Sequence, residues 1–151
     1  MEAARERCLR LLSTRARSEA ELRSRLRRAG FSPQVAEAAL ERLRGAGLVD
    51  DAEFARAWVE ARRAAGGSGP AKLRWELRRK GVAEELIRRF VDEARDEQAE
   101  LADALALARR RMAHGPADTA ALGRLRRLLL RRGYGDETVE SVMSRYLSEE
   151  G

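Results

Sequence analysis

Two leucines four residues apart, flanked by arginines and followed by a glycine, recur three times along the chain. The three copies are Leu22, Leu26 and Gly30; Leu73, Leu77 and Gly81; and Leu125, Leu129 and Gly133. Leucines at this spacing share one face of a helix, and a glycine that tolerates positive φ can end it. The pattern predicts one amphipathic, basic helix used three times.

Apolar positions at helical spacing and residues typical of helix ends extend this pattern to nine helices. They are expected at about 2–13, 19–29 and 33–45, after Asp50, from Pro70 to Gly81, at 83–97, from Gln98 to His114, from Pro116 to Gly133, and from Asp136 to about Glu149. Ser18 with Glu21 has the spacing of a capping box, and Asp50 is expected to cap the fourth helix. The glycine-rich stretch Gly66–Pro70 is expected to be a flexible linker and the best candidate for a hinge.

These elements predict an all-α fold of three tandem three-helix repeats, which together form an elongated, curved array. The predicted boundaries are 1–49, 50–97 and 98–151. A chain of 151 residues can bury a core without disulfides or metal, and Cys8 is its only cysteine. The charged N-terminal residues and the absence of a long apolar run indicate a cytoplasmic protein with no membrane contact. We expect a monomer.

The charge of the chain favours a polyanionic partner. The net charge is +6, but only Lys72 and Lys80 of the 31 basic residues are lysines, so base composition alone could explain the arginine content. The distribution is more informative. Segments 69–80 and 116–132 each carry five basic residues and one acidic residue, for +4, whereas the helices that follow, 83–97 and 136–151, carry −3 and −4. Compositional drift would not sort charge by helix.

No arrangement of residues indicates catalysis, a cofactor or a metal. The stretch from Gly66 to Lys72 lacks the second glycine and the Ser or Thr of a phosphate-binding loop. The pair Asp50–Asp51 fits a helix cap better than a metal site, and Cys8 fits a core position better than a reactive thiol. His114 lies where a helix is expected to end. The glycines of Gly45–Leu48 resemble a DNA-binding hairpin only weakly, because Asp51 would repel phosphate.

Arginine-rich helix flanks are the remaining candidate site. Arg74 and Arg78 lie about 100° around the helix from the leucines, and Arg23 and Arg27 repeat this geometry. The expected contacts to a polyanion are Arg23, Arg27, Lys72, Arg74, Arg78, Arg79, Arg126, Arg127, Arg131 and Arg132. A solvated surface with ion pairs within helices is the alternative. Trp75 is expected to pack against the next repeat, or else to stack on a base or a partner.

Four further motifs are present: Arg17-Ser18-Glu19 with Glu21-Leu22, the run GLVDDAEFARAWV from Gly47 to Val59, Gly69-Pro70 before LRWELRRKGV, and Arg131-Arg132-Gly133-Tyr134. Together they resemble the RecX family of regulatory proteins. The resemblance implies a protein that lies in the groove of a RecA filament on single-stranded DNA and mainly inhibits RecA, without chemistry of its own. The sorted charge would direct basic second helices to DNA phosphates or acidic RecA surface, and acidic third helices to basic RecA surface.

Two other kinds of function stay open at this stage. A tandem helical DNA-binding protein acting without RecA would bind single-stranded or duplex DNA with a steep salt dependence. A structural adaptor would show no salt-sensitive affinity for nucleic acid.

Overall fold

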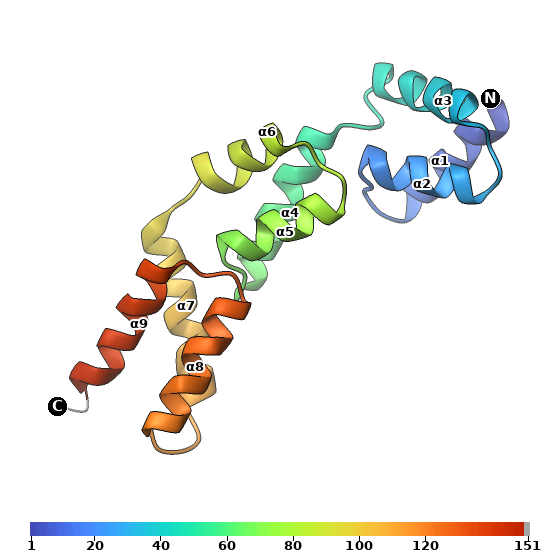
Figure 1. The fold of residues 1–151 in the computed structure, drawn as a ribbon. Helices are drawn as coiled ribbons and strands as arrows, with labels where there is room; N and C mark the ends of the chain where they lie inside the picture. Colours follow the sequence, from blue (N-terminus) through green and yellow to red (C-terminus); the bar gives the residue numbers. More distant parts are fainter. Residues whose placement is uncertain (150–151) are drawn as a thin grey trace. The chain divides into compact units, whose positions relative to one another are not determined.

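The computed structural model describes residues 1–149, which form nine α-helices and one π-helix, with no β-strand among them (Figure 1). The elements are α1 (Glu2–Thr14), α2 (Glu19–Arg28), α3 (Pro33–Gly45), α4 (Asp51–Ala65), α5 (Pro70–Arg79), α6 (Glu84–Ile87), the π-helix η1 (Arg88–Glu93), α7 (Glu97–Met112), α8 (Thr119–Arg131) and α9 (Asp136–Glu149). The prediction of an all-helical fold is confirmed.

Side-chain caps begin several helices at the positions that the sequence indicates. Ser18 and Glu21 form the expected capping box at the start of α2. Asp50 Oδ1 accepts hydrogen bonds from the backbone N–H groups of Ala52 (3.0 Å) and Glu53 (3.2 Å), so Asp50 caps α4. Helix α8 begins at Thr119 rather than at Pro116, because Asp118 accepts a hydrogen bond from Ala121 N and acts as the N-cap.

The repeated glycines end the second helix of each repeat in the same way. Gly30, Gly81 and Gly133 have φ of +93°, +76° and +88°. The residue after each glycine donates its N–H to the carbonyl five residues earlier, as in Phe31 to Leu26 (3.1 Å). This bond pairs a carbonyl that the helix end leaves open and turns the chain inward. The equivalent residues Val82 and Tyr134 are 5% and 3% exposed, so the chain returns to the core directly after both glycines.

The sixth helix differs from the continuous α-helix expected over 83–97. Only Glu84–Ile87 is α-helical, and Arg88–Glu93 continues as a π-helix. Ile87 and Val91 remain fully buried on one side, while the Arg63 guanidinium donates to the carbonyl oxygens of Val91 and Ala94 (both 3.3 Å). A side chain remote in sequence therefore satisfies carbonyls at the end of η1, which local patterning does not reveal.

The described chain groups into two compact units, and their division does not follow the predicted repeat boundaries. One unit contains Met1–Trp58 with Leu77–Ile87, and the other contains Val59–Glu76 with the chain from Arg88 onward. The first repeat lies whole within one unit and the third repeat within the other, while the second repeat contributes to both. The boundaries 1–49, 50–97 and 98–151 stay a prediction.

Helices α1, α2 and α3 pack around a core centred on Leu22, Leu26 and Leu40, all fully buried. Cys8 is fully buried in this core, as expected, and burial raises the pKa of its thiol. Leu9, the next residue of α1, is exposed. Ala4 contributes to the core one helical turn before Cys8.

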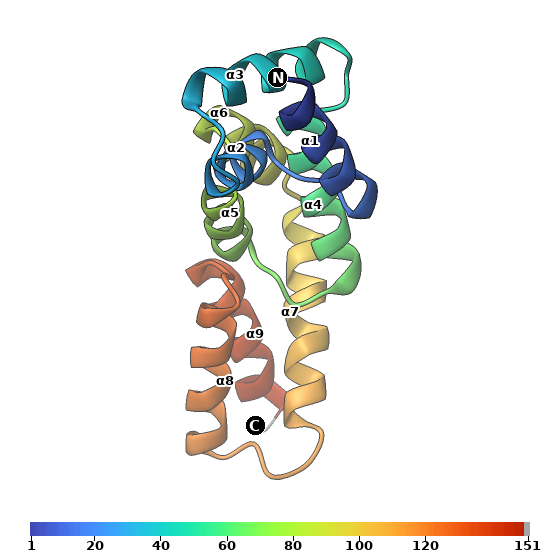
Figure 2. The same cartoon turned by 90° about the vertical axis from the view of Figure 1, so that its right-hand side faces the viewer.

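In the other unit, α7, α8 and α9 lie side by side around a second core (Figure 2). Leu129, Val139 and Val142 are almost completely buried there, together with Ala104 and Ala108 of α7. The small side chains on α7 allow the larger side chains of α8 and α9 to approach closely. The first and third repeats are thus each a three-helix bundle with its own core.

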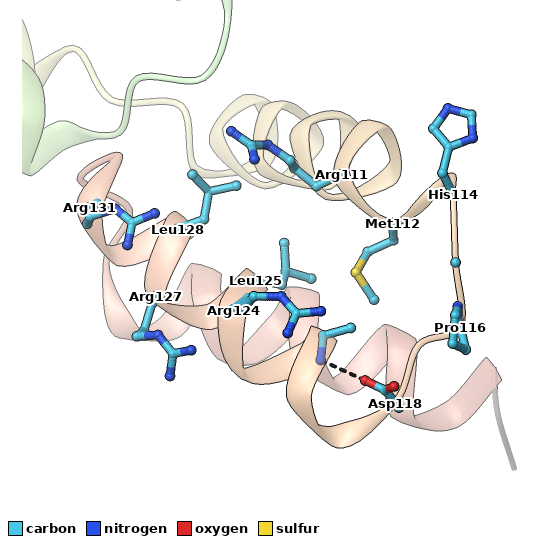
Figure 3. A pocket seen from close by; sticks show the side chains of 12 residues that line it. Arg111, Met112, His114, Pro116, Asp118, Arg124, Leu125, Arg127, Leu128 and Arg131 are labelled. Carbon is cyan, nitrogen blue, oxygen red and sulfur yellow. Dashed lines mark hydrogen bonds between the residues drawn. The ribbon is translucent and has the colours of Figure 1, made fainter.

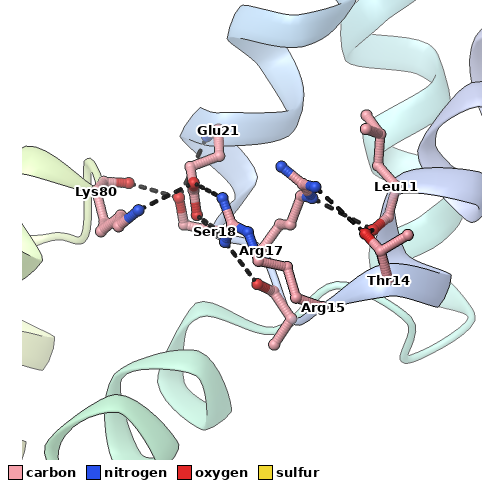
Figure 4. Close-up of polar contacts among 8 residues, drawn as sticks. Leu11, Thr14, Arg15, Arg17, Ser18, Glu21 and Lys80 are labelled. Carbon is pink, nitrogen blue, oxygen red and sulfur yellow. Dashed lines mark hydrogen bonds and ion pairs between the residues drawn. The ribbon is translucent and has the colours of Figure 1, made fainter. Parts of the chain in front are cut away.

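A cluster of polar contacts joins the start of α2 to the end of α5 (Figure 4). The Ser18 hydroxyl donates to the Lys80 carbonyl oxygen (2.5 Å), and Lys80 Nζ lies 3.2 Å from Glu21 Oε2. Glu21 also accepts from Arg15 Nη2 (2.7 Å) and from the Ser18 N–H (3.1 Å). Burial, the largest influence, raises the Glu21 pKa, but these hydrogen bonds together outweigh it and lower the pKa from 4.5 to about 2.

We expect Glu21→Gln to lower the free energy of unfolding by about 1–3 kcal/mol at pH 7, because three donors lose a charged acceptor. A carboxylate with a depressed folded-state pKa stabilises the fold above its unfolded pKa, and this contribution is lost as the pH falls. The difference between Glu21→Gln and the unchanged protein should therefore shrink between pH 4.5 and pH 2, as measured by urea denaturation. An equal difference across this range would contradict the assignment. Glu41→Gln, at an exposed position on α3, is the control.

The predicted flexible linker is wrong, because the glycine-rich stretch is held in place. Residues 67–70 are buried. Asp103 of α7 accepts from Gly67 N at 2.9 Å, and the hydroxyl of Tyr134 donates to the same carboxylate. Burial and then this hydrogen bond raise the pKa of Tyr134. Arg132 Nη1 donates to the Gly67 carbonyl oxygen (3.3 Å). These bonds tie the stretch to the third repeat.

Two glycines allow the backbones of this stretch and of the α8–α9 turn to touch. Gly69 N donates to Arg132 O (2.7 Å) and Ala71 N to Gly133 O (2.9 Å). A Cβ on Gly69 would lie 2.4 Å from Gly133 C, and a Cβ on Gly133 would lie 2.2 Å from Lys72 N. Neither position has room for a methyl group.

Gly69→Ala is expected to lower the free energy of unfolding by about 1–3 kcal/mol or more, because the methyl group meets backbone rather than a movable side chain. Gly45→Ala is the control, since no heavy atom lies within 4 Å of its Cβ position. The control should be neutral or stabilise the protein by about 0.5–1 kcal/mol. Urea denaturation of both variants tests this, and equal stabilities would refute the close backbone contact.

Candidate nucleic-acid interface

The basic residues expected to face a polyanion lie on or just after α2, α5 and α8, the second helix of each predicted repeat. Arg27, Arg78, Arg79, Arg126, Arg127 and Arg131 are exposed, whereas Arg23, Lys72, Arg74 and Arg132 are half-buried. Their accessibility therefore differs, and so do their partners.

The equivalent arginine of each repeat pairs with a carboxylate of the third helix of the same repeat. Arg23 of α2 bonds Glu37 of α3, and Arg126 of α8 bonds Glu140 of α9. In the second repeat Arg74 Nη1 lies 2.5 Å from Asp92 Oδ1 of η1. The alternation of basic second helices and acidic third helices thus provides, in part, ion pairs between neighbouring helices.

The pKa directions follow these contacts. The hydrogen bond from Arg23 lowers the pKa of Glu37, and the hydrogen bond from Arg126 lowers the pKa of Glu140. Both carboxylates are exposed, with side chains 51% and 58% accessible. Exposed ion pairs are screened by solvent and contribute little to stability. Such arginines can exchange one anionic partner for another.

Four further predicted contacts differ in what they touch. Arg78 Nε lies 2.6 Å from Glu84 Oε1. Arg132 bonds the Gly67 carbonyl, as described above, so it has a structural role. By contrast, Arg27 and Arg131 are exposed and form no ion pair within residues 1–149.

Trp75 lies on α5 and is 57% exposed. The expectation that its indole packs against the next repeat stays a prediction. Stacking of its indole on a base or a partner stays a prediction.

A pocket of about 400 Å³ lies in the third repeat, between the end of α7, the loop after it and α8 (Figure 3). Arg111, Arg124, Arg127 and Arg131 line it, together with the apolar side chains of Met112, Leu125 and Leu128. Figure 3 shows Arg124 beside Met112 in the space between the two helices, with the His114 ring pointing away from that space.

Sequence reasoning missed Arg111 and Arg124 as members of this site. Arg124, Arg127 and Arg131 are spaced by three and four residues, so a search for one helical face of α8 could have found Arg124. Arg111 comes from a different helix, and no local pattern connects it to α8.

The acidic pair Asp50–Asp51 and the turn Gly45–Leu48, which were candidates for metal or phosphate binding, have structural roles. Asp50 caps α4, and Asp51 Oδ1 accepts from Glu19 N (2.9 Å), so both carboxylates contact helix starts. Gly47 N and Leu48 N donate to carbonyls of α3 (3.0 and 2.9 Å), so this turn does not offer them to phosphate. Within residues 1–149 no three His, Cys, Asp or Glu side chains are grouped to hold a metal, and no helix is long and apolar enough to cross a bilayer.

Comparison with known protein families identifies the first two three-helix repeats. A family model described as the RecX first three-helix domain matches residues 4–43, and the model of the RecX second three-helix domain matches residues 50–89.

Relatives of known name extend the similarity over nearly the whole chain. The regulatory protein RecX of Amycolatopsis mediterranei (strain U-32) is 41% identical over 150 residues, covering 98% of this chain and 85% of that protein. The regulatory protein RecX of Mycobacterium avium (strain 104) is 40% identical over 152 residues, covering 99% and 87%.

Solved structures show the same fold. The crystal structure of RecX from Lactobacillus salivarius has a TM-score of 0.83 at 16% identity and covers 95% of this chain and 94% of that one. A second crystal structure, of regulatory protein RecX, has a TM-score of 0.82 at 25% identity and covers 95% and 71%.

The fold, the matched family models and the named relatives define a regulatory protein built from tandem three-helix domains. The chain belongs to the RecX family.

Proposed function

We propose that this protein binds the RecA recombinase and its filament on single-stranded DNA, and that it lowers RecA's ATPase and strand-exchange activity by occupying the filament groove. The near full-length relationship to regulatory proteins named RecX carries the proposal. In it the protein acts in the cytoplasm as a monomer, without catalysis of its own, through the three repeats at 1–49, 50–97 and 98–151.

The basic second helices supply the contact to polyanion in this proposal. Arg27, Arg127 and Arg131 are exposed on α2 and α8 and form no ion pair within residues 1–149, so phosphate can reach them directly. Arg78 and Arg126 would first leave Glu84 and Glu140. Because these pairs are exposed, the exchange costs little and a polyanion can drive it.

Several weak contacts on one chain explain how a small protein can restrain a polymer. Once one repeat is bound, the others meet neighbouring filament sites at high effective concentration, so binding strengthens without any single tight contact. A chain that contacts more than one protomer holds their arrangement and obstructs growth.

Reversing charge at Arg78 and Arg79 should weaken binding to RecA-coated single-stranded DNA by about tenfold or more, with a shallower salt dependence. The matched control reverses Arg88 and Arg89, an adjacent arginine pair on η1. Anisotropy titrations with labelled single strands, duplexes and RecA-coated strands, each at two salt concentrations, provide the measurement.

The same titrations separate the alternatives. Tight duplex binding without RecA would instead favour a DNA-binding protein that acts alone, and a lack of salt-sensitive affinity for every DNA would favour a structural adaptor. If the Arg78/Arg79 and Arg88/Arg89 variants lose affinity for RecA-coated single-stranded DNA equally, the proposed contact through α5 is wrong.

Removing a carboxylate that competes with polyanion should strengthen binding. Glu37→Gln removes the partner of Arg23 on α3 and leaves its pair with Glu19 (3.1 Å), so one carboxylate fewer competes for Arg23 and we expect tighter binding to RecA-coated single-stranded DNA. Glu41→Gln makes the same charge change on the same helix, at an exposed residue with no ion pair within residues 1–149. If the two variants gain equally, net charge rather than the release of Arg23 is responsible.

A further inference from the structure

The third repeat concentrates arginines that its own carboxylates do not compensate. On α8, Arg126 pairs with Glu140 of α9, whereas Arg124, Arg127 and Arg131 line the pocket beside α7. None of these three, nor Arg111 of α7, forms an ion pair within the described chain. A smaller basic pocket, of about 280 Å³, lies beside α2 and is lined by Arg15, Arg17, Arg25, Arg28, Arg79 and Lys80. It differs from the α7–α8 pocket because Glu21 in its lining pairs with both Arg15 and Lys80.

The charge of this pocket favours an anionic ligand. Its lining holds four arginines and one carboxylate, Asp118, for a net charge of +3. Asp118 Oδ1 already accepts a hydrogen bond from Ala121 N (2.8 Å) as the cap of α8. Guanidinium groups gathered in one concave site repel each other, and a bound phosphate relieves this repulsion while matching their planar donors.

The remaining surface of the pocket is apolar. Met112 is half-buried, and Leu125 and Leu128 are 2% and 6% exposed, so their side chains form a floor beneath the arginines. Inorganic phosphate has no apolar group that could contact these side chains. A nucleotide carries both a phosphate, for the arginines, and a flat base, for the apolar surface. A volume of about 400 Å³ lies at the small end of ligand sites, which suits one nucleotide unit.

We propose that this pocket binds one nucleotide unit of an unpaired DNA strand, with the phosphate held by Arg124, Arg127 and Arg131 and the base placed over Met112. This inference rests on the proposed function and deepens it, because it assigns contact with single-stranded DNA to one pocket of the third repeat. An unpaired base can turn into a concave site, whereas a duplex keeps its bases stacked inside.

The double variant Arg124→Gln/Arg127→Gln tests the pocket on the full chain, with naked labelled oligothymidine in an anisotropy titration. Losing two single-strand phosphate contacts should weaken binding by about tenfold or more and reduce the slope of log affinity against log salt by about 1.4. The control Arg109→Gln/Arg110→Gln removes the same charge from exposed positions of α7 outside the pocket. Equal effects of the two double variants would overturn the proposal.

A second variant places a carboxylate in the pocket while keeping every arginine. Ala121→Glu lies in the first turn of α8, where a negative charge suits the helix dipole, so the fold should be retained, and circular dichroism checks this. We expect a similar loss of affinity for oligothymidine. Unchanged affinity in a folded variant would contradict the site.

Competition identifies the source of the ligand. Thymidine monophosphate should displace oligothymidine only weakly, and pyrophosphate and duplex DNA should compete less well than an unlabelled single strand of equal length. Displacement by the mononucleotide at the same concentration as by the strand would refute the assignment to a DNA strand.

The proposed function and this pocket can fail separately. Binding of the same variants to RecA without DNA measures the protein contact alone. Loss of oligothymidine binding with RecA binding retained supports the pocket, whereas retained oligothymidine binding refutes it whatever happens with RecA.

Discussion

The burial of two leucines one turn apart beneath each second helix is the interaction on which the rest of the structure depends. Leu22, Leu26, Leu73, Leu77, Leu125 and Leu129 are each no more than 2% exposed. Their burial orients the helix, and the glycine that follows turns the chain back into the core. With the inward face fixed in this way, arginines on the same helix must lie along its flanks, where they reach either a neighbouring helix or solvent.

These arginines fall into two groups: those that pair with carboxylates inside a repeat, and those that line the pocket between α7 and α8. Arg23, Arg74 and Arg126 occupy equivalent positions, and all three contact a carboxylate of the next helix or of η1. They balance charge inside each repeat through contacts between the second and third helices. The arginines around the α7–α8 pocket have no carboxylate partner within the described chain. Arg124, Arg127 and Arg131 are nevertheless counted in the same +4 of segment 116–132 as Arg126. Counting charge by helix could not distinguish the two groups, because the distinction depends on which side of the helix each residue occupies.

Features governed by neighbours in sequence could be predicted, and features governed by remote contacts could not. The capping box at Ser18 and the glycine ends of the second helices follow from short-range hydrogen bonds, and the structure has both. The π-helix η1 and its contact with Arg63 depend on residues about thirty positions apart. Within the candidate site, the basic character of α8 was evident from the sequence, but the participation of Arg111 required the packing of α7 on α8.

The backbone contact between Gly69 and Gly133 bears on how the molecule can be dissected. A fragment that starts at residue 98, where the third repeat is predicted to begin, would contain Asp103, Arg132 and Gly133 but not the segment Gly67–Ala71 to which they hydrogen-bond. The carbonyl oxygens of Arg132 and Gly133 would lose their donors, Gly69 N and Ala71 N. The Asp103 carboxylate would keep its hydrogen bond from Tyr134 but lose the one from Gly67 N. An excised third repeat therefore needs Gly67–Ala71 attached if it is to keep these hydrogen bonds.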